Sequence, residues 1–140
     1  MSSIYFFSEK IEFILPQKAV IRSWIKKVVN LENKTLTGLN FIFCSDRYLI
    51  ELNRQYLNQD YLTDIITFDQ SDSEALHGDI YISIARVKEN ATKCQKSFEN
   101  ELFRVMIHGV LHLVGFGDGS DKEREIMRIK EEASLSLLPL

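Results

Sequence analysis

The spacing of apolar residues in the first third of the chain predicts two strands around one helix. Near the N-terminus, SIYFFSE and IEFIL predict one short strand or a pair of strands. Residues 17–31 carry apolar side chains at helical spacing, which predicts a helix with Pro16 in its first turn. In TGLNFIFC, the alternation of Leu39, Phe41 and Phe43 predicts the next strand.

The middle of the chain predicts a helix followed by two strands. Ser45 or Asp46 can cap a helix that runs to about Leu57, and NQDYLT then predicts a loop. The runs DIITF and GDIYISI are rich in residues that favour strands, and only the polar stretch DQSDSEALH separates them. We therefore expect these two runs to form neighbouring strands.

Three helical segments complete the chain. ARVKENATKCQKS predicts a moderately helical, basic segment, and Ser97 then begins the most hydrophobic helix, which Gly115 can end as a left-handed cap. SDKE has the spacing of a capping box and predicts a last helix to about Ser136. The order β-α-β-α-β-β-α-α-α predicts an α+β (α/β-like) fold, a small mixed sheet of about four strands packed with helices.

The length, net charge and cysteine content of the chain further limit what the protein can be. The 140 residues contain no linker or repeat, so we expect residues 1–140 to form a single domain. The net charge of -3 argues against a protein that coats nucleic acid by bulk charge, although a local basic face remains compatible with it. Two cysteines give no disulfide framework, and the apolar runs are too short for a signal peptide or a membrane span. We expect a cytoplasmic protein without a membrane partner.

The hydrophobic helix carries two histidines in HGVLHLVGFGD. His108 and His112 are four residues apart, so both imidazoles project from one face and can reach one metal ion. Gly115 lets the chain turn back, and Asp118 can then add a carboxylate ligand. Three protein ligands leave a fourth position open for water, as in catalytic zinc sites, so we expect one zinc ion per chain. Histidines that only complete a core are the alternative, but each would need a buried partner.

Nearby residues refine this site. Glu101 and Arg104 precede His108 by seven and four residues, so they extend the same polar stripe and could support the ligands. The metalloprotease motif H-E-x-x-H has a glutamate after its first histidine, where this chain has Gly109. The missing glutamate, which activates water in those enzymes, disfavours peptide hydrolysis.

At these residues the sequence resembles the YbeY endoribonucleases, also called ribosomal RNA maturation factors. Their signature H-G-x-L-H-L-x-G-Y-D-H is similar to HGVLHLVGFGD here. Their L-N-x-x-[YW]-R, T-[DN]-V-L-S-F and G-D-I motifs look like LNRQYL, TDIITF and GDIYIS, and order and spacing agree from about residue 40 to 132. Two positions depart from the family pattern, since Asp118 replaces the third histidine and Leu57 replaces an arginine. Arg54 and Arg104 are candidates to replace that arginine.

The resemblance implies a central metal-bearing helix and a zinc-dependent, single-strand-specific endoribonuclease. Its partners would be precursor ribosomal RNA and the small ribosomal subunit with its associated proteins. Its role would be maturation of the 16S 3′ end and ribosome quality control. His108 and His112 would act through the metal, with Arg104 as a further catalytic candidate. The alternatives are a non-catalytic ribosome-assembly module with a structural or vestigial metal site, and a metallopeptidase, which Gly109 disfavours.

RNA contacts would require cations near the site. Arg86, Lys93 and Lys96 are spaced to share one helix face, and with Arg54 they are the candidates for RNA contact. An ordinary solvated face that includes Glu89 is the alternative explanation. No general base stands within the histidine motif itself. The candidates are Asp121, Glu123 and Glu101, although Asp121 and Glu123 also suit the start of the last helix.

Overall fold

The elements follow the predicted order in a computed structural model that describes residues 3–57 and 63–140. The strands are β1 (Ser3–Glu9), β2 (Thr35–Cys44), β3 (Ile65–Asp69) and β4 (Ala75–Ser83). The helices are α1 (Lys18–Leu31), α2 (Asp46–Leu57), α3 (Ile84–Lys93), α4 (Phe98–Val114) and α5 (Asp121–Leu135). Most of the predicted NQDYLT loop lies outside the described residues.

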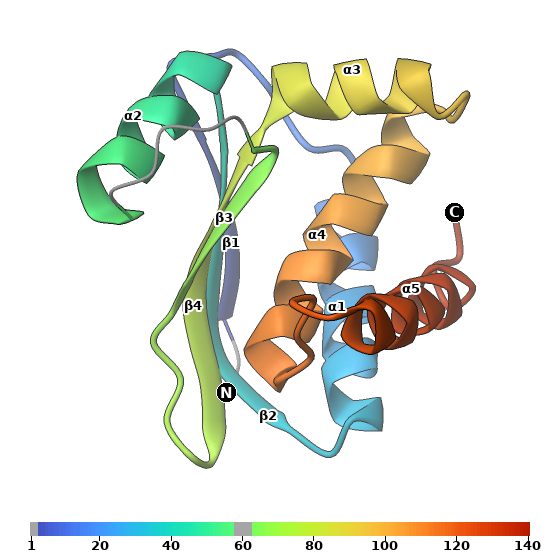
Figure 1. Ribbon diagram of the computed structural model, residues 1–140. Coiled ribbons are helices and arrows are strands. Elements are labelled where there is room, and N and C mark those ends of the chain that lie inside the picture. Colours follow the sequence, from blue (N-terminus) through green and yellow to red (C-terminus); the bar gives the residue numbers. More distant parts are fainter. Residues whose placement is uncertain (1–2, 58–62) are drawn as a thin grey trace.

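The strands form one mixed sheet in the order β1-β2-β4-β3, which confirms the predicted fold class. β1 pairs with β2 and β2 with β4 in parallel, whereas β3 and β4 pair antiparallel as the predicted neighbours. Figure 1 shows α1, α4 and α5 on one face of the sheet, α2 on the other, and α3 across one end. The main core therefore lies between the sheet and α4, with a smaller cluster under α2.

The central helix α4 has the predicted ends. The Ser97 hydroxyl accepts a hydrogen bond from the Asn100 backbone N–H at 3.1 Å, and Gly115 ends the helix with a φ of 127°. The Phe116 N–H then donates to the Leu111 carbonyl at 3.0 Å, which satisfies an orphan carbonyl of the last turn. Ten of the 17 residues of α4 are buried, so the helix contacts other elements around most of its circumference. In the described part of the chain, neither α4 nor another helix combines the length and apolarity needed to cross a membrane.

Two glycines allow α4 and the strands to pack closely. A Cβ at Gly109 would lie 2.9 Å from Cδ1 of Ile80 and 3.1 Å from Cδ1 of Ile65, so this position of α4 faces the sheet. A Cβ at Gly78 would lie 2.7 Å from the Phe68 carbonyl oxygen. Added side chains would therefore crowd the contact of α4 with the sheet at Gly109 and the contact between β3 and β4 at Gly78.

Several predicted boundaries were wrong, for local reasons. Of the two alternatives for the N-terminal segment, the structure has the single strand β1, and IEFIL is not a strand, because the chain turns at Lys10, whose φ is 64°. Pro16 precedes the first turn of α1, because Gln17 is the N-cap. β4 begins at Ala75, inside the stretch predicted as a connection, because Asp72 closes a turn by accepting hydrogen bonds from the Glu74 and Ala75 backbones.

The basic segment before α4 is less helical than predicted. α3 ends at Lys93, and Gln95 then adopts a φ of 55° in a left-handed turn. The Lys96 N–H donates to the Ala91 carbonyl at 2.9 Å and closes this turn. Lys96 therefore lies beyond the helix, and helical spacing does not place it on the same face as Arg86.

We expect the substitution Gly78→Ala to destabilise the fold by about 1–3 kcal/mol, because the new methyl group would overlap a backbone oxygen that cannot rotate away. Gly119→Ala is the matched control, since its Cβ would meet only Glu123 Oε1, at an ordinary 3.6 Å. Chemical denaturation of both variants measures the difference. Equal stability of the two variants would contradict the proposed close packing.

Candidate metal centre

The two histidines of α4 and the aspartate after it come together as predicted. The Nε2 atoms of His108 and His112 lie 3.5 Å and 3.3 Å from Oδ2 of Asp118. One ligand atom from each residue lies within 4.8 Å of the others, and the two rings meet edge to face with centroids 4.6 Å apart. The turn at Gly115 makes this possible, because it reverses the chain and returns Asp118 to the histidine face.

The donor set and its spacing fit a zinc ion. Two ligands of a tetrahedral zinc, each about 2.0–2.1 Å from the ion, lie about 3.3–3.4 Å apart. The two measured distances to Asp118 Oδ2, 3.3 Å and 3.5 Å, are close to that value. Imidazole and carboxylate are also ligands that zinc accepts. His108, His112 and Asp118 are therefore suited to hold one divalent ion.

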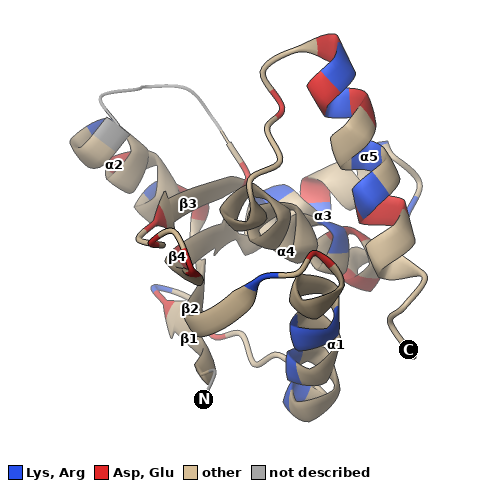
Figure 2. Ribbon diagram, turned by 90° about the horizontal axis from the view of Figure 1, so that it is seen from below, with Lys and Arg blue, Asp and Glu red and all other residues tan. Residues whose placement is uncertain are grey.

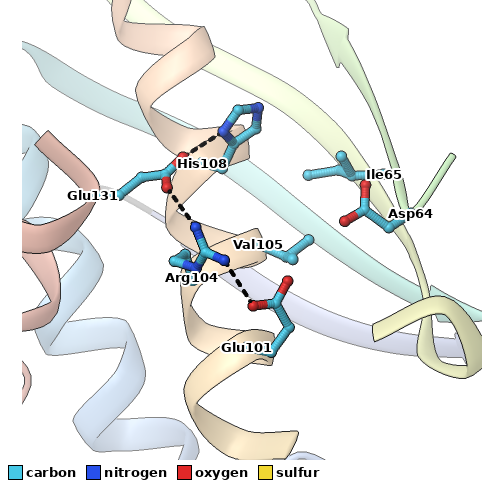
Figure 3. A pocket seen from close by; sticks show the side chains of 7 residues that line it. All are labelled: Asp64, Ile65, Glu101, Arg104, Val105, His108 and Glu131. Atoms are coloured by element: carbon cyan, nitrogen blue, oxygen red, sulfur yellow. Dashed lines mark hydrogen bonds and ion pairs between the residues drawn. The ribbon is translucent and has the colours of Figure 1, made fainter. Parts of the chain in front are cut away.

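The other ring nitrogen of His108 contacts a residue that the sequence analysis missed. Figure 3 shows Nδ1 of His108 directed at the carboxylate of Glu131 on α5, and the distance to Oε2 is 2.6 Å. The other oxygen of Glu131 accepts a hydrogen bond from Arg104 Nη1 at 3.3 Å, and Arg104 Nη2 donates to Glu101 at 3.0 Å. Glu101 and Arg104 thus belong to the polar stripe as predicted, but the direct partner of His108 is Glu131.

Glu131 is marked by its burial, which only the structure shows. Met127, Glu131 and Ser134 are the buried residues of α5, and their spacing of four and three residues marks one inward face. A carboxylate on that face needs a buried partner. Local patterns alone do not identify the partner, because it lies 23 residues away on another helix.

The charges around His108 affect its protonation. Burial lowers the pKa of the His108 ring, but the hydrogen bond and negative charge of Glu131, together with the charges of Asp118 and Asp64, outweigh burial, so the pKa lies above its usual value. Burial likewise lowers the pKa of Arg104, and Glu101 and Glu131 more than offset this. Arg104 is therefore a permanent cation between two carboxylates.

The cluster lies in a cleft with two connected hollows. The hollow of about 400 Å³ is lined by Asn53, Thr63, Asp64, Ile65, Ile66, Thr67, His108, His112 and Asp118. The hollow of about 260 Å³ is lined by Asp64, Ile65, Glu101, Arg104, Val105, His108 and Glu131. Asp64, Ile65 and His108 line both hollows, so the cleft runs past His108 between the start of β3 and α4 (Figure 3).

The residues predicted to contact RNA differ in their exposure and in their ion-pair partners. Arg86 forms a two-pronged ion pair with Asp46, at 3.1 Å and 3.2 Å, and this pair joins α3 to α2. Lys93 is exposed and pairs with Glu89 at 3.0 Å, which matches the solvated-face alternative. Lys96 is exposed in the turn after α3.

Arg54 is exposed on α2. Leu57, which replaces the family arginine, ends the same helix, and its side chain lies outside the described residues. Figure 2 shows a further group of positive charges along α1, which carries four lysine or arginine residues and no acidic residue. The members of that group are Lys18, Arg22, Lys26 and Lys27.

The candidates for the general base lie in different surroundings. Glu101 is buried against Arg104, and Asp121 pairs with Arg124 at the exposed start of α5. The Glu123 backbone N–H donates to the Ser120 hydroxyl at 3.1 Å, as expected for the helix cap. Asp64, just before β3 in the TDIITF run, is a carboxylate that lines both hollows.

Comparisons with known proteins agree on one family. A family model described as "Endoribonuclease YbeY" matches residues 5–138. The Cytophaga hutchinsonii protein named "Endoribonuclease YbeY" is 49% identical over 136 residues, covering 96% of this chain and 95% of that protein. A protein of the same name from Amoebophilus asiaticus is 51% identical over 131 residues, covering 93% and 89%. A solution structure of a Thermotoga maritima protein is similar with a TM-score of 0.69 and 29% identity, covering 96% of this chain and 88% of that one.

We expect the purified protein to bind about one zinc ion per chain and Asp118→Ala to bind much less, because two imidazoles alone leave the ion without its only anionic ligand. Elemental analysis after dialysis measures this ratio. Glu125→Ala, which removes an exposed carboxylate from α5, is the matched control and should retain the wild-type zinc content. If the folded wild-type protein bound no metal, both histidines would instead be core residues.

Proposed function

The chain belongs to the YbeY endoribonuclease family, and on this basis we propose that it is a zinc-dependent endoribonuclease that cleaves single-stranded RNA. The observation that carries the proposal is the convergence of His108, His112 and Asp118 in a polar cleft. We further propose that it acts in the cytoplasm on precursor ribosomal RNA. There it would contribute to 16S 3′-end maturation and ribosome quality control together with the small subunit and its proteins.

The cleft residues suit a phosphodiester substrate. When bound, a zinc ion would supply Lewis acidity, which polarises a phosphoryl oxygen and lowers the pKa of a water molecule to about 7. His108 and His112 would hold the ion as neutral ligands, and the single negative charge of Asp118 would leave a net positive centre for a phosphate. Asn53 and Thr67 supply polar groups to the wall of the same hollow, where RNA could form hydrogen bonds.

The packing of Gly109 supports a nuclease over a metallopeptidase. In the protease motif, the residue after the first histidine is the glutamate that activates water. Here that position is Gly109, which faces Ile80 and Ile65 of the sheet, and a side chain there would require those isoleucine side chains to shift. The motif therefore lacks the protease base, and a reaction at this site takes its base from elsewhere.

A ribosome-assembly module without catalysis is the second candidate. The observation that favours it is the engagement of cations near the cleft, since carboxylates hold both Arg86 and Arg104. Leu57 and Asp118 also depart from the family pattern. In that case the metal would stabilise the fold and the cleft would bind RNA without cutting it.

We expect His108→Ala and His112→Ala to lower RNA cleavage by about 100-fold or more. Removing a ligand removes a charge stabilisation worth several kcal/mol, and each 1.36 kcal/mol changes the rate tenfold. Cleavage of a labelled single-stranded RNA measures the rates, and circular dichroism checks that the fold is retained. His77→Ala, at an exposed histidine on β4, is the control and should cleave at the wild-type rate.

A cleavage rate unchanged by either ligand substitution would contradict the nuclease proposal. RNA binding without cleavage by the metal-loaded wild type would favour the assembly module. Turnover of a peptide library would instead favour the metallopeptidase.

We also propose Arg54, Lys93 and Lys96 as RNA contacts, with Arg86 holding α3 against α2 beside them. The double substitution Lys93→Ala, Lys96→Ala should weaken RNA binding and reduce the slope of log affinity against log salt by about one to two, since each phosphate contact contributes about one. Fluorescence anisotropy over a salt series measures the slope. The matched control, Lys26→Ala with Lys27→Ala on α1, removes the same charge, and an equal effect of the two double variants would exclude a specific contact.

A further inference from the structure

The Nδ1 atom of His108 faces away from Asp118 and makes a contact that metal binding alone does not require. We propose that Glu131, held by Arg104 and Glu101, is a positioning residue that fixes the tautomer and orientation of His108. This inference rests on the proposed metal centre and does not depend on which reaction the centre performs. It assigns a role to a carboxylate of α5 that no motif marks.

The two ring nitrogens of His108 have unequal partners. Nδ1 lies 2.6 Å from Glu131, whereas Nε2 lies 3.5 Å from Asp118. A short hydrogen bond to a carboxylate is charge-assisted and stronger, so the proton of the neutral ring is placed on Nδ1. The lone pair of Nε2 then points at the cluster, in the form that can ligate a metal.

Glu131 is itself held on both sides. Its side chain is only 7% exposed, and its second oxygen accepts a hydrogen bond from Arg104. Arg104 in turn pairs with Glu101, whose side chain is 6% exposed. Without Arg104, two buried carboxylates would face each other and their charges would repel. The guanidinium of Arg104 therefore orients the Glu131 carboxylate beside His108.

The helix that carries Glu131 is anchored at neighbouring positions. Trp24 donates its indole N–H to the Ser134 carbonyl at 2.7 Å. Lys130 pairs with Glu32, at the end of α1, at 2.8 Å. Both contacts join α5 to α1 instead of to the cleft. The carboxylate of Glu131 is thus presented to His108 by a helix that the rest of the fold holds in place.

The metal-bound ligand set and the network of Glu131, Arg104 and Glu101 would carry opposite net charges. Two neutral histidines and Asp118 would leave a divalent ion with a net charge of about +1. Glu131, Arg104 and Glu101 together carry about -1 and touch the ligand set through His108. An ion network that only stabilised the fold would not need to contact Nδ1 of His108, the ring nitrogen opposite the metal-facing Nε2. A network that positions the ligand would need this contact.

The test compares zinc affinity, by competition with a chromogenic chelator, in the wild type, Glu131→Ala, Glu131→Gln and the control Glu132→Ala. Glu132 is the exposed neighbour on the same helix. We expect about 10–100-fold weaker zinc binding for Glu131→Ala, the usual effect of losing such a partner. Glutamine keeps the shape but offers one acceptor oxygen to the two donors, so its affinity should fall between those of alanine and wild type. The Glu132→Ala control should bind zinc like the wild type.

A second readout needs neither metal nor RNA. In alkaline buffer, where the His108 ring is neutral, two-dimensional ¹H–¹⁵N spectra of the metal-free protein report which nitrogen carries the proton. We expect the Nδ1–H tautomer in the wild type and a shift toward Nε2–H in Glu131→Ala, since Asp118 then becomes the stronger acceptor. A merely structural role for Glu131 would not move this signal.

Wild-type zinc affinity and an unchanged tautomer in folded Glu131→Ala would overturn the proposal. If Glu131→Ala does not fold, the same two results in Glu131→Gln would overturn it. Failure of the nuclease proposal looks different, because a wild type that does not cleave RNA would still show the affinity loss and the tautomer shift.

Discussion

The close packing of α4 on the sheet is the constraint on which the site depends. Gly109 faces Ile80 and Ile65, where a Cβ would lie 2.9 Å and 3.1 Å from their Cδ1 atoms, so the helix is rotated with this side against the sheet. With that rotation, the stripe that contains His108 and His112 faces the cleft and α5 instead of the sheet. The same absence of a side chain removes the position used for the base in metalloproteases, so packing and chemistry are decided together.

The cleft concentrates carboxylates in a protein proposed to bind an anionic polymer. Asp64, Glu101, Asp118 and Glu131 line its two hollows, and Arg104 is the cation beside them. Two of these carboxylates are occupied by Arg104, and Asp118 faces the two histidines. A divalent ion would therefore bring the positive charge that the protein groups themselves do not supply. Binding of RNA and binding of metal are expected to depend on each other for this electrostatic reason.

Two predicted RNA contacts have surroundings that the sequence did not reveal. Arg86 lies on α3 as predicted, and it pairs with Asp46, 40 residues earlier in the chain. Lys96 looked helical because the composition around it continues that of α3, and a left-handed residue at Gln95 ended the helix first. Both depend on contacts or backbone conformations that composition does not encode.

The sequence by itself determined the order of the elements, the mixed sheet, the caps at Ser97 and Gly115, and the three candidate ligands. The elements, caps and ligands follow from local signals, since apolar periodicity, capping residues and the i, i+4 spacing of His108 and His112 act within a few turns of chain, and the mixed sheet was inferred from the order of the elements. Only the tertiary structure decided that Glu131 is the partner of His108, because α5 must first dock against α1 and α4 to bring it there. The direction of Gly109 toward the sheet was decided in the same way, since periodicity shows that a helix is buried but not which neighbour each face meets.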